Sequence, residues 1–168
     1  MRITIQDGTY LLNTESKRRS EMGYRSEVAY VINFSSKEKR DDYINVVLAT
    51  GDTHLIDALK DCDVPFDSSH DTRINFYAID VKWYDSYEDV KAHTKLYSWA
   101  VELYPDDCGY RFICIGEEEG DIENDSDGEG DWIPDDDFYT YTSMEVPFNT
   151  QYDKFDLDKY LLTKKEEA

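Results

Sequence analysis

The sequence predicts an α+β fold: a mixed, largely antiparallel sheet with helices packed on one face. Strand-like and helix-like segments occur without strict alternation and without an internal repeat. With 168 residues, of which 40% are hydrophobic, the chain has enough apolar side chains for a core. We therefore expect one domain over residues 1–168, in which residues 1–66 and 72–162 could form subdomains.

The first predicted elements are a hairpin and a strand. Asp7 and Gly8 lie between two strand-like runs within residues 3–12, and this dipeptide is the strongest short-range signal for a β-hairpin. Residues 27–34 alternate between apolar and other positions, which predicts a strand with one buried face. The apolar residues of that face are Val28, Tyr30, Ile32 and Phe34.

Two short helices are expected next. Ser35 opens a capping box, which predicts the start of a helix, and Gly51 provides its C-terminal cap. Asp52 or Thr53 begins the second helix. This helix should end before Pro65, because the residue before a proline avoids helical backbone angles.

Residues 74–115 are predicted to form a strand-helix-strand unit. Residues 74–83 alternate as a strand does, with aromatic and apolar side chains on one face. Ser86 is expected to cap the following helix, which ends before Pro105. Residues 110–115 supply the second strand.

An acidic loop is predicted at residues 117–137, because 12 of these 21 positions are Asp or Glu, none is Lys or Arg, and three are Gly. Residues 138–142 have strand propensity and could pair across the loop. Residues 152–162 should dock as a short terminal element, and residues 163–168 should form a frayed tail.

The net charge of the chain is −20, and it is concentrated in the last part of the sequence. Residues 1–60 carry 9 basic and 9 acidic residues, whereas residues 101–168 carry 5 basic and 21 acidic residues, a net charge of −16. Binding to nucleic acid phosphates or to an anionic membrane requires clustered Lys and Arg. We therefore expect no direct nucleic acid partner and no membrane partner.

Targeting signals and cysteine usage favour the cytoplasm. The N-terminal residues lack the apolar run of a signal peptide, and no segment approaches the length of a membrane span. Cys62, Cys108 and Cys114 form an odd set without a C-x-x-C pair, which is typical of reduced thiols and lacks the paired spacing of a structural zinc site.

Catalysis and cofactor binding have little support. His54, His70 and His93 are scattered, and the glycine-rich phosphate-binding motifs are absent, so we predict a protein that is not an enzyme and has no cofactor. Residues 123–128 resemble the start of an EF-hand. Pro134 stands where that motif needs its bidentate Glu, so no specific metal site is predicted. Weaker divalent-cation binding stays an alternative.

The acidic loop has two interpretations, a solvated insertion or a surface that engages a basic site. Fully extended, its 21 residues span at most ~70 Å, which places one charge per ~6 Å. A single nucleic acid strand carries one charge per ~3.4 Å. Nucleic acid mimicry therefore requires the loop to fold back on itself.

Asp135, Asp136 and Asp137 are adjacent, and adjacent carboxylates diverge too much for a two-metal centre.

Aromatic residues in and beside the loop suggest contact with a partner. Trp and Tyr are enriched among the residues that dominate interface energies. Trp132 could equally hold the loop against the body of the protein. The predicted partner-binding residues are Asp121, Glu123, Asp125, Asp127, Asp131, Trp132, Asp135, Asp136, Asp137, Tyr139 and Tyr141.

A small, strongly acidic chain rich in Tyr and Asp, with an irregular α+β pattern, resembles the early proteins of tailed phages and mobile elements. The resemblance implies a non-catalytic inhibitor of a host enzyme that binds a basic or nucleic-acid-binding surface through its acidic C-terminal half. Its alternative is an inhibitor or adaptor of a host ATP-dependent protease such as Lon, bound through Trp132, Tyr139 and Tyr141. Steep salt dependence and competition with DNA would favour the first.

Overall fold

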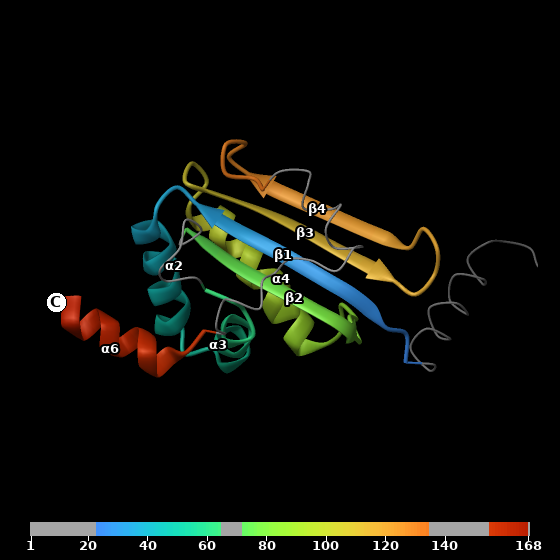
Figure 1. Ribbon diagram of the computed structural model, residues 1–168, viewed down its shortest axis with the longest axis horizontal. Coiled ribbons are helices and arrows are strands. Elements are labelled where there is room, and N and C mark those ends of the chain that lie inside the picture. Colours follow the sequence, from blue (N-terminus) through green and yellow to red (C-terminus); the bar gives the residue numbers. More distant parts are fainter. Residues whose placement is uncertain (1–22, 65–71, 135–154, 168) are drawn as a thin grey trace, which may run out of the picture.

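The computed structural model describes residues 23–64, 72–134 and 155–167, which form an α+β fold and so confirm the predicted fold class. In these residues a four-stranded sheet has the order β2-β1-β3-β4, with every pair antiparallel (Figure 1). The elements are β1 (Ser26–Phe34), α2 (Lys37–Ala49), α3 (Thr53–Lys60), β2 (Arg73–Val81), α4 (Glu88–Leu103), β3 (Cys108–Gly116), β4 (Ile122–Gly128) and α6 (Leu157–Glu167).

Strand β1 lies at the centre of the core and pairs on both sides. Tyr30 is opposite Phe76 of β2 and Phe112 of β3. Because both neighbours are antiparallel to β1, β2 and β3 run parallel to each other with β1 between them. The predicted strand-helix-strand unit is therefore present, but its two strands are separated by β1. The predicted hairpin at 3–12 and strand at 138–142 lie outside the described residues.

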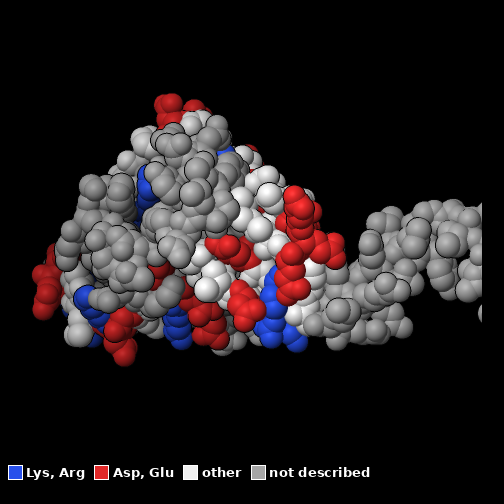
Figure 2. Space-filling model, turned by 45° about the vertical axis from the view of Figure 1, so that its right-hand side comes forward, with Lys and Arg blue, Asp and Glu red and all other residues white. Residues whose placement is uncertain are grey.

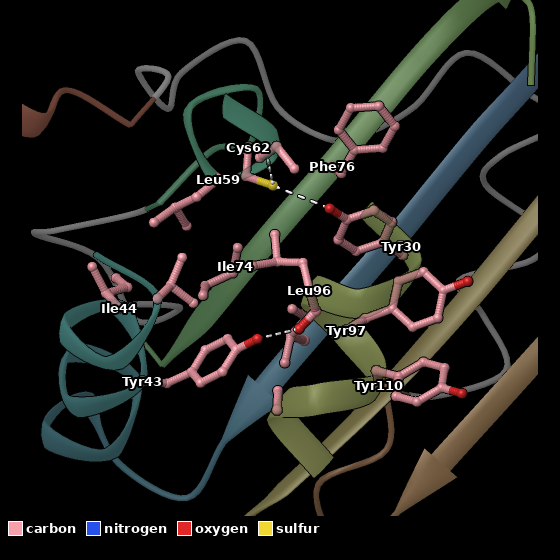
Figure 3. Packing of buried hydrophobic residues seen from close by; sticks show 14 of the residues in the cluster. Tyr30, Tyr43, Ile44, Leu59, Cys62, Ile74, Phe76, Leu96, Tyr97 and Tyr110 are labelled. Carbon is pink, nitrogen blue, oxygen red and sulfur yellow. Dashed lines mark hydrogen bonds between the residues drawn. The ribbon is translucent and has the colours of Figure 1, made fainter. Parts of the chain in front are cut away.

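The hydrophobic core lies between one face of the sheet and the helices (Figure 3). Tyr30 is its centre, with ring centroids 5.1 Å from both Phe76 and Tyr97. The Tyr30 hydroxyl lies 2.8 Å from Nδ1 of His93 and 3.3 Å from Sγ of Cys62, so this polar atom is satisfied within the core. Burial of each such ring contributes roughly 2–3 kcal/mol. His93 is thus a packed core histidine.

The N-terminal ends of α2 and α3 are capped by side chains. Ser36, not the predicted Ser35, caps α2 and accepts a hydrogen bond from the backbone N–H of Lys39. The Ser35 hydroxyl instead donates to Asp107, 2.8 Å away, so it is engaged elsewhere. Asp52 caps α3, as predicted, and accepts from two backbone N–H groups. At the C-terminal end of α2, Gly51 has a φ of 67°, a backbone conformation that favours glycine.

The cap predicted for α4 is wrong. The residue before the helix is Tyr87 rather than Ser86, and it makes no side-chain capping hydrogen bond. Glu88 and Asp89 occupy the first turn, where negative charge is stabilised by the helix dipole. The helix ends at Leu103, before Pro105, as predicted.

Helix α6 docks on α2. The Tyr160 hydroxyl donates to Oδ1 of Asn45, 3.0 Å away, and Nζ of Lys164 donates to Asp41, also at 3.0 Å. Residues 163–167, predicted to be a frayed tail, continue the helix. The ion pair from Lys164 to the buried Asp41 provides the physical reason, because it ties this last turn to α2.

Candidate partner-binding site

Residues 122–128 form strand β4, so the prediction of a loop over 117–137 is wrong for this segment. Asp125 lies opposite Phe112, and Glu123 lies opposite Cys114. Asp, Asn and Gly are poor strand formers. Here the backbone hydrogen bonds to β3 outweigh that preference, and β4 becomes an edge of the described sheet.

A sequence signal for this strand exists in the charges themselves. Every second residue from Glu117 to Asp131 is acidic. A period of two is the period of a β-strand, in which alternate side chains share one face. Three carboxylates therefore project from the same face of β4. We call them the acidic strand surface: Glu123, Asp125 and Asp127, all exposed.

The acidic strand surface borders an aromatic part of the core. Tyr110 of β3 packs with its ring centroid 4.6 Å from that of Tyr97 on α4. Its hydroxyl donates a 2.7 Å hydrogen bond to the Asp125 carboxylate. Burial is the main reason that the pKa of Tyr97 is raised to about 12, and the charges of Asp125 and Glu123 add to it.

A pocket of about 490 Å³ lies beside the first residues of β4. The start of β1, the end of β3 and the start of β4 meet there, at the right-hand side of Figure 1. The segment before α4 forms the opposite wall. We call this cavity the aromatic pocket, because its lining includes Tyr24, Trp83, Tyr84 and Tyr87 together with Asp85, Asp121, Glu123 and Cys114.

Hydrogen bonds among the lining residues fix the shape of the aromatic pocket. The Tyr24 hydroxyl donates to the Asp121 carboxylate and accepts from the backbone N–H of Glu118. The Tyr84 hydroxyl donates to the backbone carbonyl of Tyr24, 3.2 Å away. Gly116 leaves room for this arrangement, since a Cβ at that position would collide with both Tyr24 and Asp121.

The aromatic pocket is electronegative. The pKa of Glu123 is raised, first by partial burial and then by the neighbouring carboxylates of Asp85, Asp125 and Asp121. The pKa of the Cys114 thiol is raised as well, mainly by burial and further by three of these acidic residues. Figure 2 brings this side of the molecule forward and shows several groups of acidic side chains, with Lys and Arg side chains beside some of them.

Trp132 holds the chain after β4 against the body of the protein. Its indole N–H donates to the backbone carbonyl of Asp106, 3.3 Å away, and its own carbonyl accepts from the side chain of Asn33 at 3.1 Å. The chain passes so close to Gly109 that a Cβ there would lie 2.7 Å from the backbone nitrogen of Ile133. These contacts support the interpretation that Trp132 fixes the loop, while Asp131 beside it is exposed.

The structure brings some predicted site residues together and leaves others outside its description. Strand β4 carries Glu123, Asp125 and Asp127, and Asp121 directly precedes it. The aromatic pocket was missed, because its residues come from three separate segments that no motif connects. Outside the described residues lie Asp135, Asp136, Asp137, Tyr139 and Tyr141.

In the described ranges 23–64, 72–134 and 155–167, no group of three or more His, Cys, Asp or Glu side chains is placed to hold a metal ion. In the same ranges, no helix has the length and apolar character needed to cross a bilayer.

No protein family, curated protein or solved structure that was compared with this chain matches it.

Proposed function

We propose that this protein is a non-catalytic acidic inhibitor that acts in the cytoplasm and binds a basic surface of another protein through the acidic strand surface. One observation carries the proposal: Glu123, Asp125 and Asp127 project from one exposed face of a strand whose position is fixed by pairing with β3. Charges held in a row on a rigid strand can match a row of Lys or Arg without first becoming ordered.

The spacing of the charges bears on the type of partner. Alternate residues of a strand are roughly 6.8 Å apart, about twice the ~3.4 Å per phosphate of a nucleic acid strand. The described part of the acidic segment pairs with β3 instead of folding back on itself, so β4 alone supplies half that density. Asp121 and Asp85, which line the adjoining aromatic pocket, extend the negative surface. Strand β4 therefore does not copy the spacing of phosphates, and the proposal is that its charges occupy a basic, nucleic-acid-binding groove of a host enzyme without imitating the nucleic acid strand. Within this proposal the inhibitor is encoded by a phage.

Acidic residues on an edge strand have a simpler use, since they prevent pairing with other sheet edges and keep a protein soluble. The two explanations predict different effects on partner binding when individual carboxylates are neutralised. Solvation depends on total charge, whereas recognition depends on particular carboxylates.

The test is affinity capture from a bacterial extract with three forms of the protein. Asp125→Asn/Asp127→Asn removes two charges from the acidic strand surface and keeps oxygen acceptors in place. Asp42→Asn/Glu166→Gln, on exposed sites of α2 and α6, removes the same charge elsewhere. Wild type and the α2–α6 variant should retain a partner that double-stranded DNA displaces, and the strand variant should lose it. Equal capture by all three forms, or a partner that DNA does not displace, would contradict the proposal.

A further inference from the structure

We propose that the aromatic pocket receives one cationic side chain, the ammonium of Lys or the guanidinium of Arg, from the protein partner. The source of the cation, a protein partner, rests on the proposed function. The preference of the pocket for a cation does not depend on that function. The pocket volume of about 490 Å³ falls within the range of ligand-binding pockets and is large enough for one long side chain.

The aromatic walls form the first part of the argument. Rings from two separate segments line the pocket, Tyr24 before β1 and the Trp83–Tyr87 segment before α4. Tyr84 and Tyr87 pack edge to face, with centroids 5.1 Å apart. The faces of Trp and Tyr rings attract cations, and pockets lined by several rings are a common means of binding ammonium groups.

The carboxylates form the second part. Asp85 and Glu123 line the cavity, and Asp121, which accepts the hydrogen bond from Tyr24, lies beside them. Partial burial first, and then the neighbouring carboxylates of Asp85, Asp125 and Asp121, raise the pKa of Glu123, and a cation bound beside these carboxylates would favour the charged form of Glu123. Rings alone would suit an apolar ligand; rings and carboxylates together select a positive charge.

Two cations of the neighbouring segments, Lys91 and Arg25, pair with acidic residues that do not line the pocket, while the Lys82 ammonium lies near Gly23. Nζ of Lys91 is 2.7 Å from Oε1 of Glu88, and Nε of Arg25 is 3.9 Å from Oδ1 of Asp80. The N-terminus of α4 contributes a partial positive charge near the pocket. Acidic residues in the first turn of that helix offset it.

The experiment is an NMR titration of the whole protein with small probes, followed at the Trp83 indole N–H signal. The probes are N-acetyl-lysine amide, N-acetyl-arginine amide and N-acetyl-citrulline amide, the last being a neutral analogue of arginine. The cationic probes should shift the Trp83 signal in a saturable way, and the citrulline probe should not. Equal shifts with citrulline, or no saturable shift with either cation, would overturn the proposal.

Variants separate the contributions of charge and ring. Asp85→Asn/Glu123→Gln should weaken binding of the cationic probes about tenfold, as should Tyr87→Leu. Tyr87→Phe keeps the ring and should bind like wild type, as should Asp42→Asn/Glu166→Gln. Tyr87 is 41% exposed, so its replacement leaves the core intact. If Asp85→Asn/Glu123→Gln bound the cationic probes with unchanged affinity, the proposal that the pocket carboxylates bind a cation would be contradicted.

The titration needs no partner protein, so its failure differs from failure of the proposed function. A lack of cation-selective binding would overturn the proposal that the aromatic pocket binds a cation. It would not bear on the proposal that the acidic strand surface binds a partner. Cation-selective binding combined with a partner capture that Asp125→Asn/Asp127→Asn does not change would support the pocket and contradict the proposed function.

Discussion

The Tyr110 hydroxyl donates a 2.7 Å hydrogen bond to the Asp125 carboxylate and so joins the aromatic core to the acidic strand surface. Tyr110 is only 5% exposed, whereas Asp125 is exposed. The contact shows that the acidic residues of β4 belong to the folded body of the protein. A solvated insertion would have no such connection to a core side chain.

Tyr110→Phe should lower the free energy of unfolding by about 1 kcal/mol, because it removes the donor to Asp125 and leaves the packing of the ring unchanged. Urea denaturation measures the change. Tyr87→Phe, an exposed position, serves as the control and should stay within about 0.5 kcal/mol of wild type. A Tyr110→Phe variant as stable as this control would show that the hydrogen bond contributes nothing.

The stability of the protein should fall in alkaline solution between pH 10 and about 12. Burial is the main cause that raises the pKa of Tyr77 and Tyr97 from 10.0 to about 12. Between these values the unfolded chain loses protons that the folded protein keeps, so the free energy of unfolding decreases as pH rises. Below pH 10 this contribution is fully present.

Tyrosinate absorbance and circular dichroism, recorded together, measure this alkaline transition. The buried tyrosines should ionise only as the secondary structure is lost. Ionisation of all tyrosines near pH 10 with an unchanged circular dichroism spectrum would be the opposite result.

Glu123→Gln should stabilise the protein slightly at neutral pH. The folded-state pKa of Glu123 is raised above its usual value of 4.5, so the folded protein binds this proton more tightly than the unfolded chain does. The penalty for ionising Glu123, which comes first from partial burial and then from the neighbouring carboxylates, is absent below pH 4.5 and appears as pH rises through the folded-state pKa. We expect a gain of less than about 1 kcal/mol, since solvent screens this exposed group.

Thermal denaturation at neutral and acidic pH measures this gain, with the exposed Glu102→Gln as the control. The advantage of Glu123→Gln over wild type should disappear in acid. A destabilised Glu123→Gln at neutral pH would mean that this carboxylate makes a favourable contact instead.

Cys114 should react faster when the acidic residues of the pocket are neutralised. Burial first, and then Glu123, Asp121 and Asp85, raise the pKa of its thiol above 9.0. Asp85→Asn/Glu123→Gln removes two of these charges. The rate of alkylation by neutral iodoacetamide at mildly alkaline pH should therefore rise roughly threefold, which corresponds to about half a pKa unit.

Mass spectrometry of the alkylated protein and its peptides identifies the modified residue. Cys62 and Cys108 are fully buried and should react only on unfolding. The variant Asp42→Asn/Glu166→Gln controls for total charge. An equal rate at Cys114 in all forms would show that the pocket acids do not act on this thiol.

Strong local patterns made the central elements predictable. The alternation in residues 74–83 and the proline after α4 carried enough information to place β2 and α4. Strand β4 was missed because its Asp, Asn, Ser and Gly residues have low strand propensity and no apolar face. Its pairing with β3 is a tertiary contact, and only the alternation of its charges indicated it.

The aromatic pocket could not be predicted for a different reason. Tyr24, Trp83 and Asp121 are far apart in the sequence, and each is unremarkable alone. They meet only because β1 pairs with both β2 and β3, and β3 pairs with β4. The sheet topology, which places β1 between β2 and β3, was the information that the linear pattern lacked.

The salt dependence of binding to the captured partner tests the acidic strand surface most directly. For wild type and Asp42→Asn/Glu166→Gln, the association constant should fall steeply between about 0.05 and 0.2 M salt. Asp125→Asn/Asp127→Asn should bind about tenfold more weakly at low salt and show a shallower slope. Identical affinities and slopes for the three forms would contradict recognition through this strand.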